Sequence, residues 1–467
     1  MYNHANQYRC TIIRGKSQKE MDDLLPAYAK VINEICPCEA DNFEALFNNA
    51  FSKFLPVASR IKKTLDNHRT EISGKLFGMY YFSDDGNVYE SDRTKKFLED
   101  NDQPAFFKDI CYKMQFPNGM QKCQTVQERI HDKISIRPNS FVLRLLLAAR
   151  TANIEITKKD IGYYVLNSLD VLQGKATPFE VLETIAKDKN DGIERLIVVP
   201  GKASSYTYQH INEQLNYLEL ANLIRITDDK RVSINPKELK SINLIADNWD
   251  KPPAFDVYQF DLSSVEARKV FQFEWDAYYA KLSDCVDSFT TAADALLVEE
   301  NAQDNVGTDG REGTNRIEFG DEGEDLIYNY EKKRVSSFNP RLANKVLSLG
   351  KTKGLGYDIQ SVVAEPGDFS EFVKYIEVKS TKRLTVPDIS DALWIDTLNI
   401  TRNEYVAAMQ HGIYYSIFRV YFTRNGVTVF VLSNVAEKLS TGKVHATPMT
   451  YRIDFSNASV DKVFTIN

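Results

Sequence analysis

The sequence predicts a multidomain α+β protein, with a mostly helical N-terminal half and a C-terminal α/β domain built on a mixed sheet. Its 467 residues are too many for one ordinary core and suggest about three domains at roughly 150 residues each. Hydrophobic residues make up 43% of the chain and charged residues 26%, which is typical of a folded protein. The stretch 301–316 is rich in Asn, Asp, Gly and Thr and indicates a flexible linker between the halves.

Two segments of the N-terminal half, 58–91 and 206–238, share one pattern: a helical stretch and then two short strands joined by a polar turn. A helix followed by such a β-ribbon is typical of a winged helix, a variant of the helix-turn-helix. We therefore predict a helical and winged-helix DNA-recognition domain over 1–140 and a second winged-helix domain over 141–255. Winged helices also serve as protein-interaction modules, so the pattern favours DNA binding without requiring it.

Polar residues on these helices are candidates for contacts with DNA. Asn and Gln can make bidentate hydrogen bonds to adenine in the major groove, and Arg and Lys contact phosphates. An ordinary solvated helix face is the alternative for both sets. The candidate base contacts are Gln209, Asn212 and Asn216, beside Glu213, and the candidate phosphate contacts are Arg60, Lys62, Lys63 and Arg69.

The segment 256–316 combines a long helix with the linker. Apolar residues from Val270 to Phe289 recur at helical spacing, and Ser263 or Ser264 can cap the helix. We predict one long amphipathic helix from there to about residue 300. Packing against the rest of the chain is favoured over pairing with a second copy.

The negative charge of the chain is concentrated in one segment. Its net charge is −7, yet residues 299–325 alone carry ten acidic and two basic residues. The other residues, 56 basic and 55 acidic, carry +1. The overall charge therefore does not exclude a nucleic-acid partner.

Neither a membrane nor an oxidising compartment is indicated. No window approaches the roughly 18 consecutive apolar residues of a membrane span, and the N-terminus lacks a secretory signal. The six cysteines form no CxxC pair and have no His at zinc-finger spacing. We expect reduced thiols in a cytoplasmic protein.

After the linker, the residue pattern predicts a helix at 319–335, strands at 354–364, 374–380 and 392–400, a helix at 401–411, and strands at 414–422 and 427–433. This order is typical of an α/β layer in which helices flank a mixed sheet.

Three charged groups, Asp358, Glu377 and Lys379, fall on the first two of these strands. Glu377 and Lys379 are two residues apart and so point to the same face. If the register places Asp358 beside Glu377, two carboxylates and a lysine meet at one point. Carboxylates suit Mg²⁺, which can activate water for phosphodiester hydrolysis, and a lysine can stabilise the developing charge. The exposed face of a hairpin is the alternative interpretation.

The C-terminal segment 320–432 resembles the PD-(D/E)XK nuclease superfamily, and most closely the NO VEIN-like C-terminal domain of restriction and defence proteins. The matching motifs, in order, are GDEGE at 320–324, GYDI at 356–359, IEVKST at 376–381 and TRNE at 401–404. The resemblance covers about a quarter of the chain and implies a nuclease domain over 317–467.

The resemblance implies that Asp358, Glu377 and Lys379 are catalytic and that Glu324, Asp358 and Glu377 bind Mg²⁺. Tyr357 stands where the superfamily's name has Pro. Thr401 and Glu404 fit a capping box, for which a structural role is favoured. His411 is expected to stabilise the C-terminal end of its helix.

More loosely, Phe116-Pro117-Asn118 and the helical run to Leu172 resemble the recognition regions of some type II restriction endonucleases. We predict a Mg²⁺-dependent, site-specific endonuclease of the type II restriction kind, acting on double-stranded DNA as a homodimer or with a second subunit. The alternatives are a partner-dependent nuclease effector of an antiphage defence system and a binding module with an unused nuclease fold.

Overall fold

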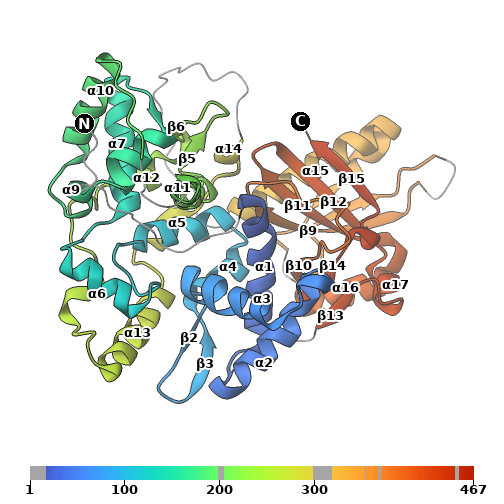
Figure 1. Ribbon diagram of the computed structural model, residues 1–467. Helices are drawn as coiled ribbons and strands as arrows, with labels where there is room; N and C mark the ends of the chain where they lie inside the picture. Colours follow the sequence, from blue (N-terminus) through green and yellow to red (C-terminus); the bar gives the residue numbers. More distant parts are fainter. Residues whose placement is uncertain are drawn as a thin grey trace. The chain divides into compact units, whose positions relative to one another are not determined.

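The computed structural model describes residues 17–197, 204–297, 318–352, 354–366, 370–447 and 452–466. The chain divides into two compact units, Met1–Thr291 and Ala292–Asn467 (Figure 1). The predicted linker at 301–316 lies outside the described residues. The domain boundaries predicted near residues 140 and 255 fall within the first unit and stay predictions. Helices dominate the first unit and a mixed sheet the second, which confirms the predicted α+β class.

The first winged-helix module surrounds an aromatic core. Phe43, Phe47 and Phe51 lie four residues apart on one helix, so they share a face, and Tyr28 stacks on Phe51 at 4.9 Å between ring centroids. A short strand from upstream completes the sheet in the order β1-β3-β2, as in a winged helix. Its elements are α1 (Gln18–Ile35), β1 (Cys38–Glu39), α2 (Ala40–Phe51), α3 (Lys62–Asp66), the π-type helix η4 (Asn67–Leu76), β2 (Tyr80–Phe82) and β3 (Asn87–Glu90).

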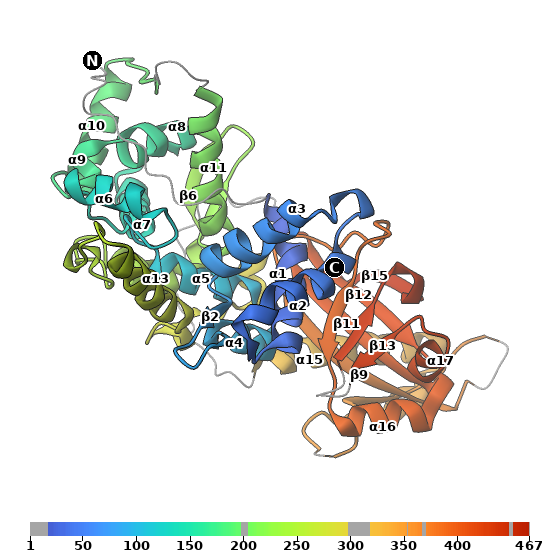
Figure 2. The same cartoon turned by 60° about the horizontal axis from the view of Figure 1, so that its bottom comes forward.

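The second module repeats this topology further along the chain. Ile211, Leu215 and Leu218 of its long helix are buried, as their spacing predicts. Its sheet has the order β4-β6-β5, again with the upstream strand beside the last one, and Figure 2 shows the two modules as separate groups. Its elements are α7 (Pro138–Ala152), β4 (Ile156–Thr157), α8 (Lys158–Asp160), η5 (Ile161–Leu166), α9 (Leu169–Leu172), α10 (Pro178–Asn190), α11 (Ser204–Leu220), β5 (Ile224–Ile226) and β6 (Arg231–Ile234).

The predicted long helix is shorter than expected. Ser264 caps α13 (Val265–Ala280) by accepting a hydrogen bond from the Ala267 N–H, but the helix ends at Ala280 rather than near residue 300. Phe271, Trp275 and Tyr279 are buried within the unit, which confirms packing against the rest of the chain. The remaining α-helices among the described residues of the unit are α4 (Asp92–Asp100), α5 (Gln103–Lys113), α6 (Cys123–His131) and α12 (Leu239–Ala246).

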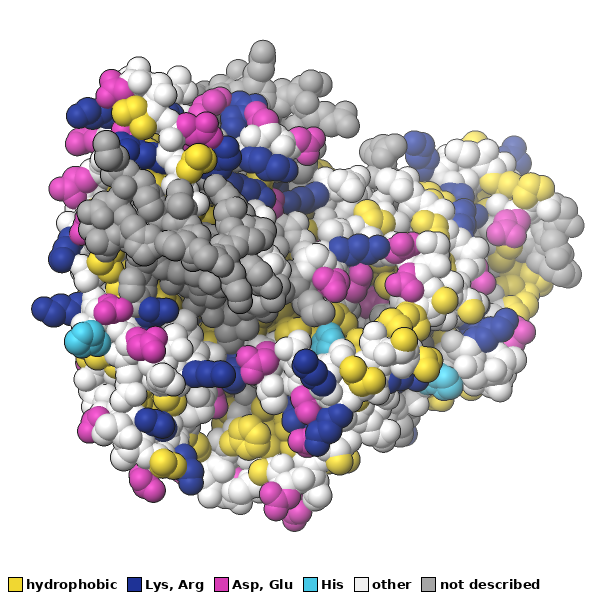
Figure 3. Space-filling view, in the orientation of Figure 1, with side chains coloured by type: hydrophobic (Ala, Val, Ile, Leu, Met, Phe, Trp, Pro, Cys, Tyr) yellow, Lys and Arg dark blue, Asp and Glu magenta, His cyan; other side chains and the backbone are white. Residues whose placement is uncertain are grey.

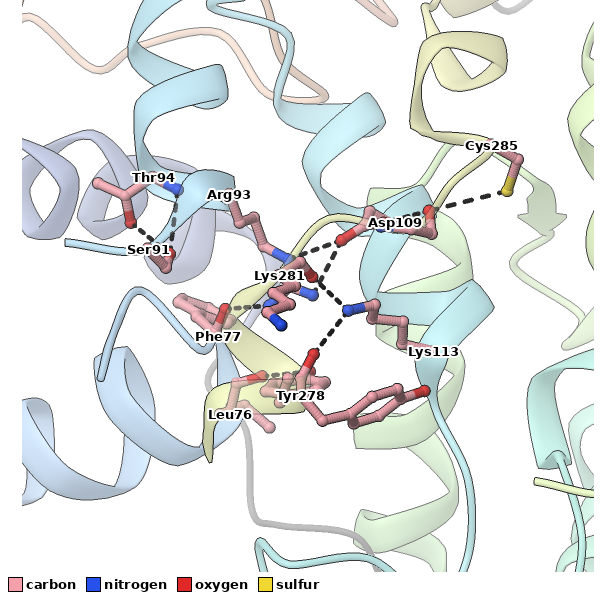
Figure 4. A network of polar contacts seen from close by, with 12 residues as sticks. Leu76, Phe77, Ser91, Arg93, Thr94, Asp109, Lys113, Tyr278, Lys281 and Cys285 are labelled. Carbon is pink, nitrogen blue, oxygen red and sulfur yellow. Dashed lines mark hydrogen bonds and ion pairs between the residues drawn. The ribbon is translucent and has the colours of Figure 1, made fainter. Parts of the chain in front are cut away.

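A buried polar network fixes α13 to α4 and α5 (Figure 4). Arg93 of α4 and Asp109 of α5 form an ion pair at 2.9 Å between Nη2 and Oδ2, with each side chain 1% exposed. Lys113 donates to the backbone carbonyls of Tyr278 and Lys281, at the end of α13. Arg93 is thus satisfied by a carboxylate and Lys113 by backbone carbonyls, and these contacts link the three helices.

The second unit is built on a main sheet. Its described strands follow the order β15-β12-β11-β9-β8-β7; β9 and β11 are parallel, and the other neighbouring pairs are antiparallel. This confirms the predicted mixed sheet. The strands are β7 (Leu347–Ser348), β8 (Ile359–Val362), β9 (Val373–Lys382), β11 (Tyr415–Thr423), β12 (Gly426–Ser433) and β15 (Lys462–Ile466).

Helices cover both faces of the main sheet. α15 (Glu318–Phe338) packs on β8 and β9, where Gly323 faces Val378 and Ser380. α16 (Arg402–His411) packs on the opposite face through Ala407 and Ala408, against Tyr415 and Ile417. Glu377 and Lys379 share the face of α16, because side chains alternate along β9. The unit also contains α14 (Ala293–Leu296) and α17 (Val435–Ser440).

Two predicted strands differ from the structure. The strand predicted at 354–364 begins only at Ile359, since Gly354 and Gly356 adopt positive φ angles of 94° and 78° in a loop. The strand predicted at 392–400 exists as β10 (Asp396–Asn399), but it lies outside the main sheet. It forms a second sheet with β14 (Arg452–Phe455) and β13 (His445–Thr447).

The described cysteines, Cys36, Cys38, Cys111, Cys123 and Cys285, are free thiols. Among the helices that the structure describes, none is long and apolar enough to cross a membrane.

Candidate active site

The strand register brings Asp358 next to Glu377. Ile359 of β8 pairs with Ile376 of β9, so the preceding residue, Asp358, falls opposite Glu377. The Asp358 N–H donates to the Ile376 carbonyl at 2.9 Å, and Asp358 Oδ2 accepts from the Val378 N–H at 2.7 Å. The negative charge of Asp358 also contributes to raising the pKa of Glu377. The two acids that the sequence pattern singled out therefore lie side by side.

Lys379 completes the predicted group and lies between two carboxylates. Its Nζ is 2.6 Å from Oε1 of Glu377 and 3.0 Å from Oε2 of Glu404. Burial lowers the pKa of Lys379, but the negative charges of Glu377 and Glu404 outweigh it, so the pKa is raised above its usual value. The lysine is held as an ammonium ion.

Of the two carboxylates of the pair, Glu377 is buried and Asp358 is half-buried. Glu377 is 2% exposed, and burial raises its pKa well above the usual range, although Lys379 acts in the opposite direction. Burial also raises the pKa of Asp358, with the hydrogen bond from the Val378 N–H only partly offsetting it. Adjacent acids with raised pKa values are characteristic of functional sites.

Asp358 and Glu377 fit a hard divalent cation, because a positive charge between them relieves both burial and mutual repulsion. Mg²⁺ commonly uses only one or two carboxylates and takes its other ligands from water and phosphate. The part of the chain that the structure describes holds no group of three or more His, Cys, Asp or Glu side chains able to bind a metal ion. The site therefore offers two protein carboxylates to a cation.

Glu324 does not complete a three-carboxylate group in this structure. It is near the start of α15, and Gly350 makes room for it: a Cβ added at Gly350 would lie 2.1 Å from Glu324 Oε2. Gly350 belongs to the loop that leads to Asp358, since the neighbouring Leu349 N–H donates to the Asp358 carbonyl at 2.6 Å. The predicted metal role of Glu324 stays a prediction.

Glu404 is a member of the cluster that the sequence pattern did not reveal. Thr401 and Glu404 form the predicted capping box at the start of α16, which confirms their structural role. The same Glu404 carboxylate also reaches Lys379. Only the packing of α16 on the sheet creates this second contact, and the TRNE motif was its single sequence signal.

His411 is not positioned as a base beside the carboxylates. Its ring stacks on Tyr375 at 3.8 Å between centroids and meets Tyr357 edge-on at 6.1 Å. Burial lowers the pKa of His411. This aromatic contact joins the end of α16 to the start of β9.

Arg419 supports the lysine from the neighbouring strand, and nothing in the sequence indicated this role. Its Nη1 donates to the Ser380 carbonyl at 3.1 Å and to the Lys379 carbonyl at 3.4 Å. Asp396 of β10 holds the guanidinium through a 2.8 Å hydrogen bond from Nε to Oδ2. The second sheet is thereby attached to the backbone that carries Lys379.

The candidate base-contacting residues of the second module are partly accessible. Gln209 and Asn212 are exposed on α11, and Asn216 is half-buried. Glu213, on the same predicted polar face, is instead buried and accepts a hydrogen bond from Gln209 at 2.9 Å. The accessible face of α11 is therefore narrower than the pattern predicted.

The candidate phosphate-contacting residues of the first module divide into two groups. Arg60, Lys62 and Lys63 are exposed, and Lys62 pairs with Glu44 at 2.8 Å. Arg69 is 8% exposed and bound by Glu44 and Asp66, both at 3.0 Å. Because the guanidinium of Arg69 is buried and paired with these two acids, the prediction that Arg69 contacts phosphate is corrected.

Charge is mixed on the face of the first unit that Figure 3 shows. In Figure 3, basic and acidic side chains are interspersed over its visible face. Such a surface agrees with the near-neutral charge of the chain outside residues 299–325.

Comparisons with known proteins match both halves of the chain. Residues 323–432 match the family model described as the C-terminal part of protein NO VEIN, in agreement with the motifs of that segment. Residues 2–276, more than half of the chain, match the model for the N-terminal part of restriction endonuclease BpuJI. None of the curated proteins gives a significant match.

A solved structure agrees with the N-terminal match. It is a crystal structure of pyrene- and phenanthrene-modified DNA in complex with the BpuJ1 endonuclease binding domain. That domain is 52% identical in sequence, with a TM-score of 0.57, and the match covers 60% of this chain and 100% of that one. The chain therefore belongs to the family defined by the N-terminal part of restriction endonuclease BpuJI.

Proposed function

We propose that the protein is a Mg²⁺-dependent endonuclease of the type II restriction kind, whose first unit binds duplex DNA and whose second unit hydrolyses a phosphodiester. The observation that carries the proposal is the grouping of Asp358, Glu377 and Lys379 on one face of a mixed sheet, where Asp358 falls opposite Glu377 and Glu377 contacts Lys379. This cluster follows a region of the restriction-endonuclease family, so binding and cutting would reside in one chain. The motif order of the second unit supports its membership of the PD-(D/E)XK superfamily.

In this proposal, Asp358 and Glu377 hold the cation. When bound, Mg²⁺ polarises the scissile phosphate and lowers the pKa of a water molecule. Lys379, held as an ammonium ion, is placed to orient the attacking water and to stabilise charge that develops on the phosphate. The Val378 N–H fixes the Asp358 carboxylate, so the group is oriented before substrate arrives.

Recognition is proposed to rest on the winged-helix modules. The related binding domain was crystallised with modified DNA, and it covers the part of this chain that contains both modules. Gln209 and Asn212 are exposed on α11, where they can reach base edges, while Arg60, Lys62 and Lys63 can contact phosphates.

One active site of this kind cuts one strand. We therefore propose that double-strand cleavage uses a homodimer or a second subunit, and that the protein acts in the cytoplasm.

The test compares wild type with Glu377→Gln on plasmid and phage DNA, in Mg²⁺ and in EDTA. Wild type should produce discrete bands only with Mg²⁺, and Glu377→Gln should lower the rate by at least about 10³-fold, as for loss of a central catalytic group. Glu371→Gln is the matched control, because Glu371 is an exposed acid two residues before β9.

Three outcomes would count against the proposal in different ways. Equal cutting by wild type and Glu377→Gln would remove Glu377 from the site. Cutting in EDTA would exclude Mg²⁺ dependence. No cutting by any sample would favour a partner-dependent effector or a binding module with an unused nuclease fold.

A further inference from the structure

We propose that Glu404 is a positioning residue for Lys379: it holds the lysine ammonium in the site while Glu377 binds the cation. The inference rests on the proposed function and adds to the site a residue from a helix rather than from the strands.

The charge arrangement requires a second partner for Lys379. Its Nζ lies between Glu377 at 2.6 Å and Glu404 at 3.0 Å. An oxygen of Glu377 that binds a cation attracts the ammonium less strongly, because cation and ammonium carry the same sign. Glu404 is then the carboxylate that keeps Lys379 in place. Its side chain is only 13% exposed, so solvent screens this ion pair weakly.

Glu404 is itself held rigidly. Its Oε2 accepts from the Thr401 N–H at 2.9 Å as well as from Lys379, and its own N–H donates to Thr401 Oγ1 at 3.3 Å. The start of α16 is fixed against the loop before Asp358, since a Cβ at Gly356 would lie 2.4 Å from the Asn403 carbonyl oxygen. The absence of a side chain at Gly356 lets the helix approach the carboxylate pair.

Another capping box in the chain shows what capping alone requires. Thr177 and Glu180 form the same reciprocal hydrogen bonds at the start of α10, where Glu180 is exposed and Thr177 is half-buried. A capping acid therefore needs neither burial nor a lysine. Asp160, the capping acid of α8, also pairs with a lysine, Lys189, at 3.1 Å. The lysine bound by Glu404 differs because it also contacts Glu377 at 2.6 Å, which points to a role of Glu404 beyond helix initiation.

Substitutions can separate the two roles. Glu404→Gln keeps a capping side chain but loses the charge, whereas Thr401→Ala loses the cap and keeps the charge. Glu404→Asp retains a carboxylate on a shorter side chain. Glu180→Gln makes the same change in the capping box of α10 and serves as the matched control.

For Glu404→Gln we expect kcat for DNA cleavage in Mg²⁺ to fall by about 10²-fold, as for loss of one electrostatic contact in a site, with an unchanged KM. Tm should stay close to that of wild type. Thr401→Ala should lower Tm and retain most of kcat, and Glu404→Asp should recover part of the lost rate. Glu180→Gln should match wild type.

A second readout does not depend on cleavage. Acetic anhydride labelling in EDTA, read by mass spectrometry, measures the reactivity of Lys379. Loss of one of its two carboxylate partners should speed labelling of Lys379 in Glu404→Gln relative to wild type.

Wild-type cleavage and labelling rates in Glu404→Gln would overturn the inference and leave the proposed function intact. Equal losses of kcat in Glu404→Gln and Thr401→Ala would also overturn it, because capping alone would then explain both. Absence of Mg²⁺-dependent cutting by wild type would overturn the proposed function together with the inference.

Discussion

Buried charges are arranged differently in the two units. The first unit contains two matched buried ion pairs: Arg93 pairs with Asp109 at 2.9 Å, and Lys108 pairs with Glu238 at 2.8 Å. In the second unit Glu377, which is buried, and Glu404, which is half-buried, both contact Lys379, and Asp358 falls opposite Glu377, so acids outnumber bases in this crowded cluster. Removal of one partner from a matched buried pair is strongly destabilising, whereas a group of acids whose pKa values are raised is typical of a functional site.

The difference belongs to the site and not to the whole second unit. Arg419 and Asp396 are also buried there, and they form a matched pair at 2.8 Å. The balance of acidic and basic side chains in a cluster therefore distinguishes a structural ion pair from a candidate functional site better than burial does.

The largest expected effect on stability concerns the matched pair. Asp109→Asn leaves the Arg93 charge without its carboxylate, and breaking a buried ion pair typically costs about 3–5 kcal/mol. Glu377→Gln should leave Tm unchanged or raise it, because it removes an acid whose pKa is raised by burial. Calorimetry of both variants measures this contrast. Equal destabilisation by the two would contradict the distinction between matched and crowded clusters.

Magnesium should stabilise the crowded cluster. A ligand that binds only the folded state adds about 2.7 kcal/mol at 100 times its Kd. Tm of wild type should therefore rise with Mg²⁺ in the absence of DNA, and the rise should be lost in Glu377→Gln. An equal rise in both proteins would show that the cation binds elsewhere.

The exposed face of α11 should contribute to sequence selectivity. Gln209→Ala combined with Asn212→Ala should weaken binding to the preferred site, since a bidentate base contact contributes about 1–3 kcal/mol. Binding to scrambled DNA should change much less. Titrations at fixed salt concentration test this, with Asn329→Ala, an exposed change in the other unit, as control. Equal weakening on both sequences would indicate phosphate contacts instead.

The smallest effect separates exposed from buried basic residues in the first module. Loss of one phosphate contact reduces the slope of log Kd against log salt by about 0.9. Lys63→Ala should show this reduction, whereas Arg69→Ala should lower Tm and leave the slope unchanged, because Glu44 and Asp66 bind Arg69 within the protein. A reduced slope for Arg69→Ala would show that Arg69 does contact phosphate.

Local pattern alone predicted the features that depend on periodicity and turn chemistry. The two-residue period of β9 placed Glu377 and Lys379 on one face, and the polar turns predicted both wings. The Thr401–Glu404 capping box and the Ser264 cap were also readable, because caps involve residues three positions apart.

The tertiary structure decided what depends on distant partners. The apolar periodicity of the sequence predicted that α13 continues beyond Ala280. The helix ends there, where Lys113 and Asp109 contact residues 278–283. Pairing with β14 placed β10 in a second sheet, and pairing with Glu44 buried Arg69.

The same distinction applies to the candidate site. The sequence determined Asp358, Glu377 and Lys379, because neighbouring strands bring them together through local register. Glu404 lies 25 residues along the chain from Lys379 and reaches it because α16 packs on the sheet. Arg419 lies 40 residues from Lys379 and reaches its backbone because β11 is the neighbouring strand. Such contacts arise from the way layers pack, and no local period encodes them.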